Sequence, residues 1–316
     1  MAAVTSHGFD VMITFADGGE YPERAVVTVG SFDGVHLGHR LLVERAGRVA
    51  RERGVESVVL TFNPHPGEVL GRPGNVRLTS VRERITLLHA AGADRVAVMA
   101  FDRQAAALTP HEFVEEILVG QLRACAVIMG HDHRFGKERR GDIALMTRLG
   151  GQLGFDVFEV AALADARGAV SSSRIRAAIG AGRVEDAARM LGRAFSLRGT
   201  VVHGDGRGST IGFPTANLDV DRSETVLPAR GVYAVWAEAV GLLPAKAMLN
   251  IGIRPTFGGS EEHAEVHVLD TKVDLYGCEV RAEFVIRLRD ESKFDGAEAL
   301  VRQLNEDRVR CRAALR

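Results

Sequence analysis

The feature that most constrains the fold is a change in the spacing of apolar residues near residue 190. Before it, short apolar runs such as 25–30 and 57–62 alternate with segments whose apolar residues recur at helical spacing. After it, the runs alternate with a period of two, and turns rich in glycine and proline separate them. The first pattern predicts a parallel sheet covered by helices, and the second an antiparallel sheet with one solvated side. We therefore expect two domains, residues 1–189 and 190–316.

The clearest period-two run lies near the C-terminus. Five apolar residues are expected to share one face of a single strand, with Val285 the apolar exception on the polar face: Val280, Ala282, Phe284, Ile286 and Leu288. A last helix is expected from about Asp295 to the end of the sequence, with Leu300, Leu304 and Val309 as its apolar residues.

Charge and cysteine usage limit the classes of partner and compartment. The 40 Lys and Arg residues nearly balance the 41 Asp and Glu residues, so no basic field favours nucleic acid or an anionic membrane. The three cysteines lie far apart, which favours a reducing compartment. No stretch approaches the roughly 18 apolar residues of a membrane span, and the N-terminus lacks the features of a signal peptide. We expect a cytoplasmic protein without nucleic-acid or membrane partners.

The sequence VGSFDGVHLGH, residues 29–39, follows the strand at 25–30 and opens a helix. A helix start presents unpaired N–H groups and the positive end of the dipole, which suits a phosphate. His36 and His39 are three apart, so both can lie on one side of the first turn, and Gly38 lets a phosphate approach the backbone. The pair suits the charge that develops on the α-phosphate of ATP. Half of a zinc site is the alternative, although no third ligand stands at helical or hairpin spacing.

The sequence GFPTAN, residues 212–217, follows a glycine-rich stretch that is not a P-loop. Thr215 and Asn217 are two apart, so in an extended segment both side chains point the same way. A hydroxyl and an amide oxygen are hard ligands that suit Mg²⁺. The alternative is a polar turn after Pro214.

Further motifs follow in a fixed order, and together they carry a resemblance. They are TFNPHP at 61–66, GHDHRFG at 130–136, SSSRIR at 171–176, NIGIRPTF at 250–257 and EVHVLD at 265–270. With the two motifs above, they resemble those of the bacterial bifunctional riboflavin kinase/FAD synthetases over nearly the whole chain. The resemblance implies a Rossmann-like nucleotidylyltransferase domain, then an antiparallel β-barrel riboflavin kinase domain with a terminal helix. Riboflavin, FMN, FAD and ATP are the implied ligands, Mg²⁺ is the implied cofactor, and a homo-oligomer is compatible with it.

The resemblance also implies roles for individual residues. In the N-terminal half, ATP phosphates would contact Gly30, Phe32, Gly38, Ser172, Ser173 and Arg176, with His36 and His39 as catalytic groups and His65 and Asp132 at the flavin and nucleotide. In the C-terminal half, Gly206, Gly208 and Gly212 would contact ATP, Thr215 and Asn217 Mg²⁺, and Asn250 and Arg289 the flavin, with Glu265 as the catalytic base. The chain departs from the family at Ser173, where Thr is usual, and at His133, where Phe is usual.

The two expected reactions need different groups. Riboflavin's 5′-hydroxyl is a poor nucleophile, so its phosphorylation requires a base such as Glu265. FMN's phosphate is already an anionic nucleophile and needs none. The alternatives are a single-activity nucleotidylyltransferase with an inert second domain, a flavin-binding store, and a paralogue that uses a modified flavin. The intact PTAN and EVHVLD motifs and the histidine pair favour the bifunctional enzyme over the first two.

Overall fold

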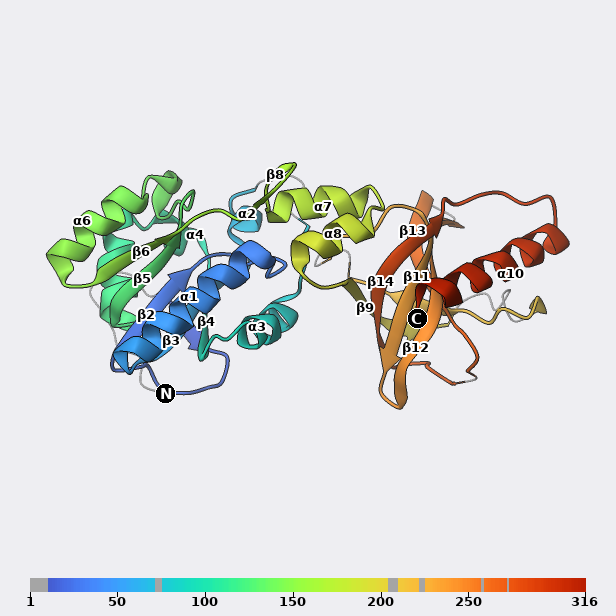
Figure 1. Cartoon of the computed structure of the whole chain (residues 1–316), viewed down its shortest axis with the longest axis horizontal. Coiled ribbons are helices and arrows are strands. Elements are labelled where there is room, and N and C mark those ends of the chain that lie inside the picture. The colour runs from blue at the N-terminus through green and yellow to red at the C-terminus, as the bar shows by residue number, and fades with distance from the viewer. Residues whose placement is uncertain (1–10, 72–75, 204–209, 222–224, 257–258, 272) are drawn as a thin grey trace. The chain divides into compact units, whose positions relative to one another are not determined.

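The computed structural model describes residues 11–71, 76–203, 210–221, 225–256, 259–271 and 273–316. The chain divides into two compact units (Figure 1). The first contains the residues up to Asn75 together with Thr79–Ser171, and the second contains Val76–Leu78 and Ser172–Arg316.

The first unit is built on a six-stranded sheet in the order β1-β4-β3-β2-β5-β6. Its strands are β1 (Ile13–Phe15), β2 (Ala25–Val29), β3 (Glu56–Asn63), β4 (Arg95–Ala100), β5 (Ala124–Gly130) and β6 (Asp156–Val160). The strands from β4 to β6 in this order pair in parallel, whereas β1 pairs antiparallel with β4. The predicted parallel sheet is confirmed. The antiparallel edge strand was not predicted, because three residues are too short for a periodic signal.

Helices cover both faces of this sheet. They are α1 (Leu37–Arg53), α2 (Pro66–Val69), α3 (Val81–Ala90), α4 (Arg103–Ala107), α5 (Pro110–Glu112), the π-helix η1 (Phe113–Gln121), the short 3₁₀ turn η2 (Lys137–Arg139) and α6 (Ile143–Leu153). The hairpin β7 (Ala164–Asp165) and β8 (Gly168–Ala169) follows. On β2, Val27 packs with η1 and α6, and Val26 packs with α1 on the other face. Because β2 is buried on both faces, its sequence is apolar throughout apart from Thr28.

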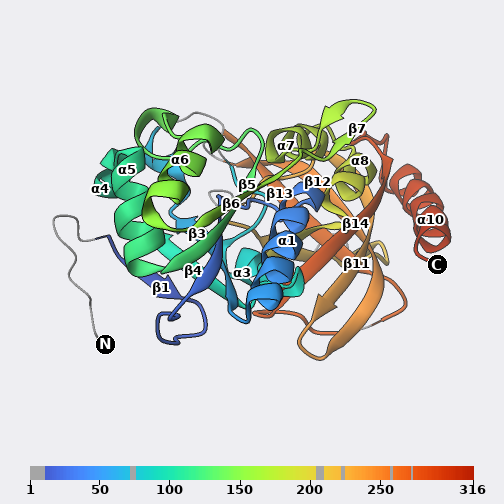
Figure 2. The same ribbon diagram turned by 60° about the vertical axis from the view of Figure 1, so that its left-hand side comes forward.

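The second unit is a closed antiparallel barrel with strand order β10-β13-β12-β11-β14-β9. Its elements are α7 (Ser172–Gly180), α8 (Val184–Leu191), β9 (Phe195–Val202), β10 (Ala216–Asp219), β11 (Gly231–Ala239), β12 (Leu242–Thr256), β13 (Gly259–Val268), β14 (Glu279–Arg289) and α10 (Ala297–Ala314). Figure 2 shows β11 and β14 side by side, as their pairing requires. Helix α10 packs across β11, β12 and β14. The predicted barrel and terminal helix are confirmed.

One prediction about β14 is wrong. Phe284 pairs with Val235 and Ile286 pairs with Ala234, so the two lie on opposite faces of the strand. The extra residue between them, Val285, forms a bulge, which explains why it was the apolar exception. Ile286 consequently joins the apolar cluster that includes residues of α10, while Phe284 packs against Tyr233.

Of the apolar residues expected on α10, Leu304 packs in the apolar cluster of the barrel. Val309 is exposed, whereas Asp307 and Cys311 are fully buried. The thiol of Cys311 donates to the carbonyl oxygen of Ala247 on β12. A buried carboxylate cannot be recognised from an apolar pattern, so the terminal helix was predicted but the burial of Asp307 was not.

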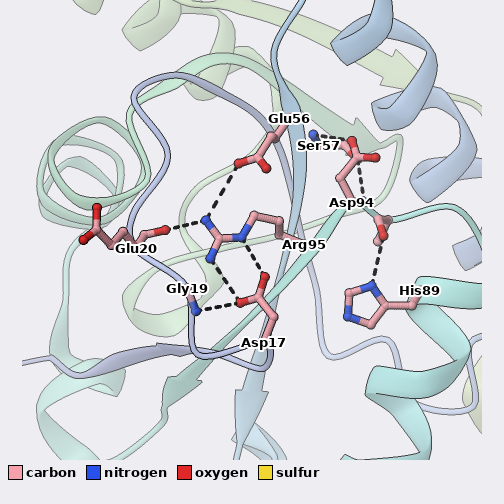
Figure 3. A network of polar contacts seen from close by, with 9 residues as sticks. Asp17, Gly19, Glu20, Glu56, Ser57, His89, Asp94 and Arg95 are labelled. Carbon is pink, nitrogen blue, oxygen red and sulfur yellow. Dashed lines mark hydrogen bonds and ion pairs between the residues drawn. The ribbon is translucent and has the colours of Figure 1, made fainter. Parts of the chain in front are cut away.

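A polar network anchors the first unit at the amino ends of its parallel strands (Figure 3). The guanidinium of Arg95 donates to both carboxylate oxygens of Asp17, at 3.0 and 3.1 Å, and to the carbonyl oxygen of Glu20. Its charge also lies 4.0 Å from the centre of the Phe15 ring. Nearby, Asp94 accepts from the main chain and hydroxyl of Ser57. These contacts fasten the 16–24 loop to the sheet and lie away from its carboxyl ends.

The division between the units falls at residue 171/172, whereas the change of periodicity predicted 189/190. Helix α8 packs on β9 and β14, and its buried side chains include Val184, Met190 and Leu191. Gly182, before α8, is so close to Arg287 of β14 that a Cβ would lie 2.9 Å from the guanidinium carbon. Helical periodicity therefore continues into the unit that contains the barrel.

This packing predicts how far the second unit can be shortened. A fragment of residues 172–316 should unfold cooperatively in urea and be more stable than a fragment of residues 192–316. The difference should be at least about 3 kcal/mol, because removing α8 uncovers several large apolar side chains, each contributing roughly 1.5–3 kcal/mol. Equal unfolding free energies of the two fragments would show that α7 and α8 contribute nothing to the barrel.

Candidate functional sites

The turn between β2 and α1 brings His36 and His39 together. His36 is the N-cap of α1, and its Nδ1 accepts the backbone N–H of His39 at 3.3 Å. The two imidazole rings stack with centroids 3.6 Å apart and an angle of 18° between their planes. Because Nδ1 of His36 accepts, the proton of the neutral ring is on Nε2, which is then a donor. The pair therefore stands at the positive end of α1, as the spacing predicted.

Three neighbouring residues shape this turn. A Cβ on Gly38 would lie 3.2 Å from the ring of His36, so a larger residue there would push the ring away by a few tenths of an ångström. A Cβ on Gly30 would similarly lie 3.2 Å from the Phe32 ring. Phe32 is buried and its ring meets the edge of His39 at 5.2 Å. The burial of Phe32 places it behind the surface of the turn, and its predicted contact with ATP stays a prediction.

Burial keeps two histidines of this region, His39 and His133, uncharged near neutral pH. It lowers the pKa of His39 well below 6.5, and the nearby charges of His36, Arg84 and His133 lower it further. Burial, together with the charge of Arg139, also lowers the pKa of His133 to about 4. His133 is therefore an uncharged aromatic ring near neutral pH, which makes its departure from the family's usual Phe chemically mild.

The candidate residues of the first unit follow three adjacent strands at their carboxyl ends. His36 follows β2, His65 follows β3 and Asp132 follows β5. From β2 the chain proceeds through β3 to β4 on one side and then through β5 to β6 on the other. The reversal between β2 and β5 is a topological switch point, where open α/β sheets bind ligands. His65 caps α2 by accepting the N–H of Gly67 through Nδ1 at 3.1 Å.

Ser172, Ser173 and Arg176 form one turn at the start of α7. The guanidinium of Arg176 lies 3.4 Å from the hydroxyl of Ser173, so these polar groups gather in one place. All three belong to the second unit. Their contact with the ATP phosphates stays a prediction.

In the second unit, strand register places three candidate residues in one row. Glu265 on β13 pairs with Asn217 on β10 on one side and with Asn250 on β12 on the other. Directly paired residues of antiparallel strands point to the same face, so the three side chains are neighbours. His263, two residues before Glu265, lies on this face as well, with its Nε2 3.4 Å from a carboxylate oxygen of Glu265.

Thr215 lies just before β10, the strand that carries Asn217, and the chain is anchored immediately before these residues. Phe213 is buried and packs against His267, whose Nδ1 contacts the carbonyl oxygen of Pro214 at 2.7 Å. Gly212 has a φ of +83°, which favours glycine. Gly206 and Gly208 lie outside the described residues.

Arg289 does not lie in this row. It is on β14, and β11 separates that strand from β12, where Asn250 lies. Its Nε donates to the fully buried carboxylate of Asp307 on α10 at 2.8 Å. Its Nη1 donates to the carbonyl oxygen of Asp290 and to the hydroxyl of Ser292. Arg289 is therefore held rigidly beside α10, the helix that packs across β11, β12 and β14.

Three polar residues near these sites were missed from the sequence: Thr79 and Arg84 behind the β2–α1 turn, and Asp307 behind Arg289. The one usable signal was at Arg84, which shares the buried stripe of α3 with Leu88. The sequence holds no such signal for Thr79 or Asp307, because their hydrogen-bond partners are distant in the sequence.

Two structural searches bear on the alternatives. Within the described ranges, no group of three or more His, Cys, Asp and Glu side chains is arranged to hold a metal ion, so a zinc site at the histidine pair gains no support there. None of the described helices combines the length and apolar character needed to cross a membrane.

Comparisons with known proteins agree with this two-site arrangement. Residues 19–174 match the FAD synthetase family, and residues 191–315 match the riboflavin kinase family. The chain is 38% identical to a bifunctional riboflavin kinase/FMN adenylyltransferase of Escherichia coli, over 92% of each sequence. It is 36% identical to the protein of the same name from Bacillus subtilis, again over 92% of each.

A solved structure from Streptococcus pneumoniae, described as a macrolide-efflux protein, has the same fold. It superposes with a TM-score of 0.83 at 36% identity and covers 92% of this chain and 94% of its own. The curated relatives and both matched families instead bear the names of flavin-cofactor enzymes. The chain belongs to the family of bifunctional riboflavin kinases/FMN adenylyltransferases, the enzymes that make FMN and FAD.

Proposed function

We propose that the two activities are divided between residues 1–189, which convert FMN to FAD, and residues 190–316, which convert riboflavin to FMN. The observation that supports this most directly is the row of Asn217, Glu265 and Asn250 in the barrel. The first unit instead offers a stacked histidine pair at a helix start, in which burial keeps His39 uncharged. Each set of groups meets the need of one reaction.

In the kinase site, Glu265 accepts the proton of the 5′-hydroxyl of riboflavin as that oxygen attacks the γ-phosphorus of ATP. The bond from the γ-phosphorus to the bridging oxygen breaks, and ADP leaves. Thr215 and Asn217 offer hard oxygen ligands beside this carboxylate and would hold Mg²⁺, which neutralises phosphate charge when bound. Asn250, on the other side of Glu265, has an amide for polar groups of the flavin.

In the adenylyltransferase site, a phosphate oxygen of FMN attacks the α-phosphorus of ATP, and pyrophosphate leaves. The attacking oxygen carries no proton, so the site needs donors rather than a base. His36 and His39 supply imidazole donors beside the N–H groups at the start of α1, and these stabilise the charge of the transition state. His65 and Asp132 lie at the ends of the neighbouring strands and contact the flavin and nucleotide.

Replacing the proposed base should separate the two activities. Glu265→Gln should slow FMN formation from riboflavin by on the order of 10²–10⁴, because the amide cannot accept the hydroxyl proton. FAD formation from supplied FMN should be unchanged in the same protein. Glu279→Gln is the matched control, since Glu279 is an exposed carboxylate on β14 that pairs with Arg198. A wild-type rate of FMN formation by Glu265→Gln would refute the assignment.

Replacing either histidine should impair FAD formation and leave FMN formation unchanged, the reverse of the effect expected for Glu265→Gln. His36→Ala and His39→Ala should each slow FAD formation by roughly 10²–10³, because each removes a donor aimed at the transferring group. FMN formation should continue at the wild-type rate. Tightly bound stoichiometric zinc in the purified protein, lost in either variant, would instead support a metal role for the pair.

His133 should make the first unit less stable in acid. Its pKa is about 4 in the folded chain and 6.5 when unfolded, so between these values the unfolded chain binds more protons. Stability is then lost as the pH falls through this window. Between pH 7.5 and pH 5, the free energy of unfolding of the native chain should fall by on the order of 1–2 kcal/mol more than that of His133→Phe. FAD formation at pH 7.5 should persist, because both rings are uncharged and aromatic.

The measurement is urea unfolding at both pH values, with circular dichroism as the signal that monitors the transition. The single tryptophan, Trp236, lies on β11, so its fluorescence reports the unfolding of the second unit separately. His111→Phe is the control, because His111 is exposed on α5. The same pH dependence in the native chain and His133→Phe would show that this imidazole is not kept neutral by the fold.

A further inference from the structure

A buried arginine lies directly behind the β2–α1 turn. Arg84 of α3 is only 1% exposed. Its Nη1 donates to the carbonyl oxygen of Ser31 at 2.7 Å, the hydroxyl of Thr61 at 3.1 Å and the carbonyl oxygen of Phe62 at 3.3 Å. Ser31 follows β2, and the other two acceptors lie near the end of β3. One guanidinium group therefore joins the carboxyl ends of two neighbouring strands.

The same segment holds the turn at a second point. The hydroxyl of Thr79 accepts the backbone N–H of Gly34 at 3.1 Å, and the N–H of Thr79 donates to the carboxylate of Asp33 at 3.2 Å. Asp33 is buried. Residues 79–84 thus contact the turn at Ser31, Asp33 and Gly34, just before the histidine pair.

The turn needs such support because its backbone is strained. Phe32 has a φ of +48° and Val35 a φ of +40°, and both carry a side chain. A positive φ is unfavourable for a residue with a side chain and persists only where the surroundings hold it. The ring of Phe32 in turn meets His39, so a change in the turn reaches the histidine.

Arg84 also contributes charge. Its guanidinium group is positively charged and lies behind the turn that carries the proposed phosphate site. That charge is one of the causes that lower the pKa of His39. A buried cation at this position favours an anionic ligand above it.

We propose that Arg84 is a positioning residue for adenylyl transfer, holding the 31–34 turn and the start of α1 in the shape that presents His36 and His39 to ATP. The proposal rests on the proposed role of the two histidines. It assigns to Arg84 no contact with substrate. Its effect is transmitted through the main chain of Ser31 and the ring of Phe32.

The alternative is that Arg84 only stabilises the fold. The chain contains a second buried arginine that serves as a control for such a purely structural effect. Arg95 is also a buried arginine that joins distant segments of the first unit, but at the amino ends of the strands (Figure 3). Arg84→Met and Arg95→Met remove the same group from opposite ends of one sheet. Arg82→Met, at an exposed position of α3, controls for the substitution itself.

The experiment measures kcat and KM for FAD formation, FMN formation and thermal unfolding for each full-length variant. Arg84→Met should lower kcat for FAD formation by on the order of 10²-fold, the scale of a misplacement of about 1 Å. KM for ATP should change much less, and FMN formation should stay at the wild-type rate. Arg84→Lys should recover part of the loss, since it keeps the charge but not the planar set of donors. Arg95→Met should lower the unfolding temperature and leave kcat of the folded protein unchanged.

Equal kcat values for folded Arg84→Met and folded Arg95→Met would overturn the inference. Should Arg84→Met fail to fold, Arg84→Lys and Thr79→Val serve in its place, and wild-type kcat in both would overturn it equally. His39→Ala, measured in parallel, separates this result from the proposed function. If kcat for FAD formation falls in His39→Ala but not in the Arg84 variants, the positioning role of Arg84 is rejected and the histidine role is kept. Loss of kcat in the Arg84 variants without loss in His39→Ala rejects the histidine role, and with it the inference that Arg84 acts by positioning the histidines.

Discussion

The pairing of β2 between β3 and β5 is the constraint on which the first site depends. Because β2 is buried on both faces, its apolar side chains fix the strand between two layers of helices. Parallel pairing then puts the carboxyl ends of β3, β2 and β5 at one edge. His65, His36 and Asp132 reach the same edge only for this reason. No local signal could place them together, since they are far apart in the sequence.

Register plays the corresponding part in the barrel. Glu265 is useful as a base only if a ligand for the ATP-bound cation and a group for the flavin lie beside it. Pairing places Asn217 on one side of Glu265 and Asn250 on the other, because β13 lies between β10 and β12, and these are the two residues proposed for those roles. A slip of one residue would turn Glu265 to the other face and bring Val266 or Ala264 into the row. Because β13 is paired on both sides, its register is fixed by two neighbouring strands.

The two sites also differ in how they treat charge. In the first unit, burial and neighbouring positive charges keep His39 neutral, while Arg84 remains charged beneath the turn. In the second, Glu265 is partly exposed and stays near His263. The first arrangement suits a nucleophile that already carries negative charge, and the second suits a hydroxyl that must lose a proton. This contrast follows from which side chains each fold buries.

The sequence by itself determined the two fold classes, the order of their elements and nearly all the candidate residues. Periodicity reports which face of an element is buried, and motifs such as VGSFDGVHLGH and PTAN are local. Tertiary structure decided the rest. The grouping of α8 with the barrel, the bulge at Val285 and the burial of Asp307 depend on partners distant in the chain. So does the role of Arg84, because the oxygens it binds become neighbours only when β2, β3 and α3 pack together.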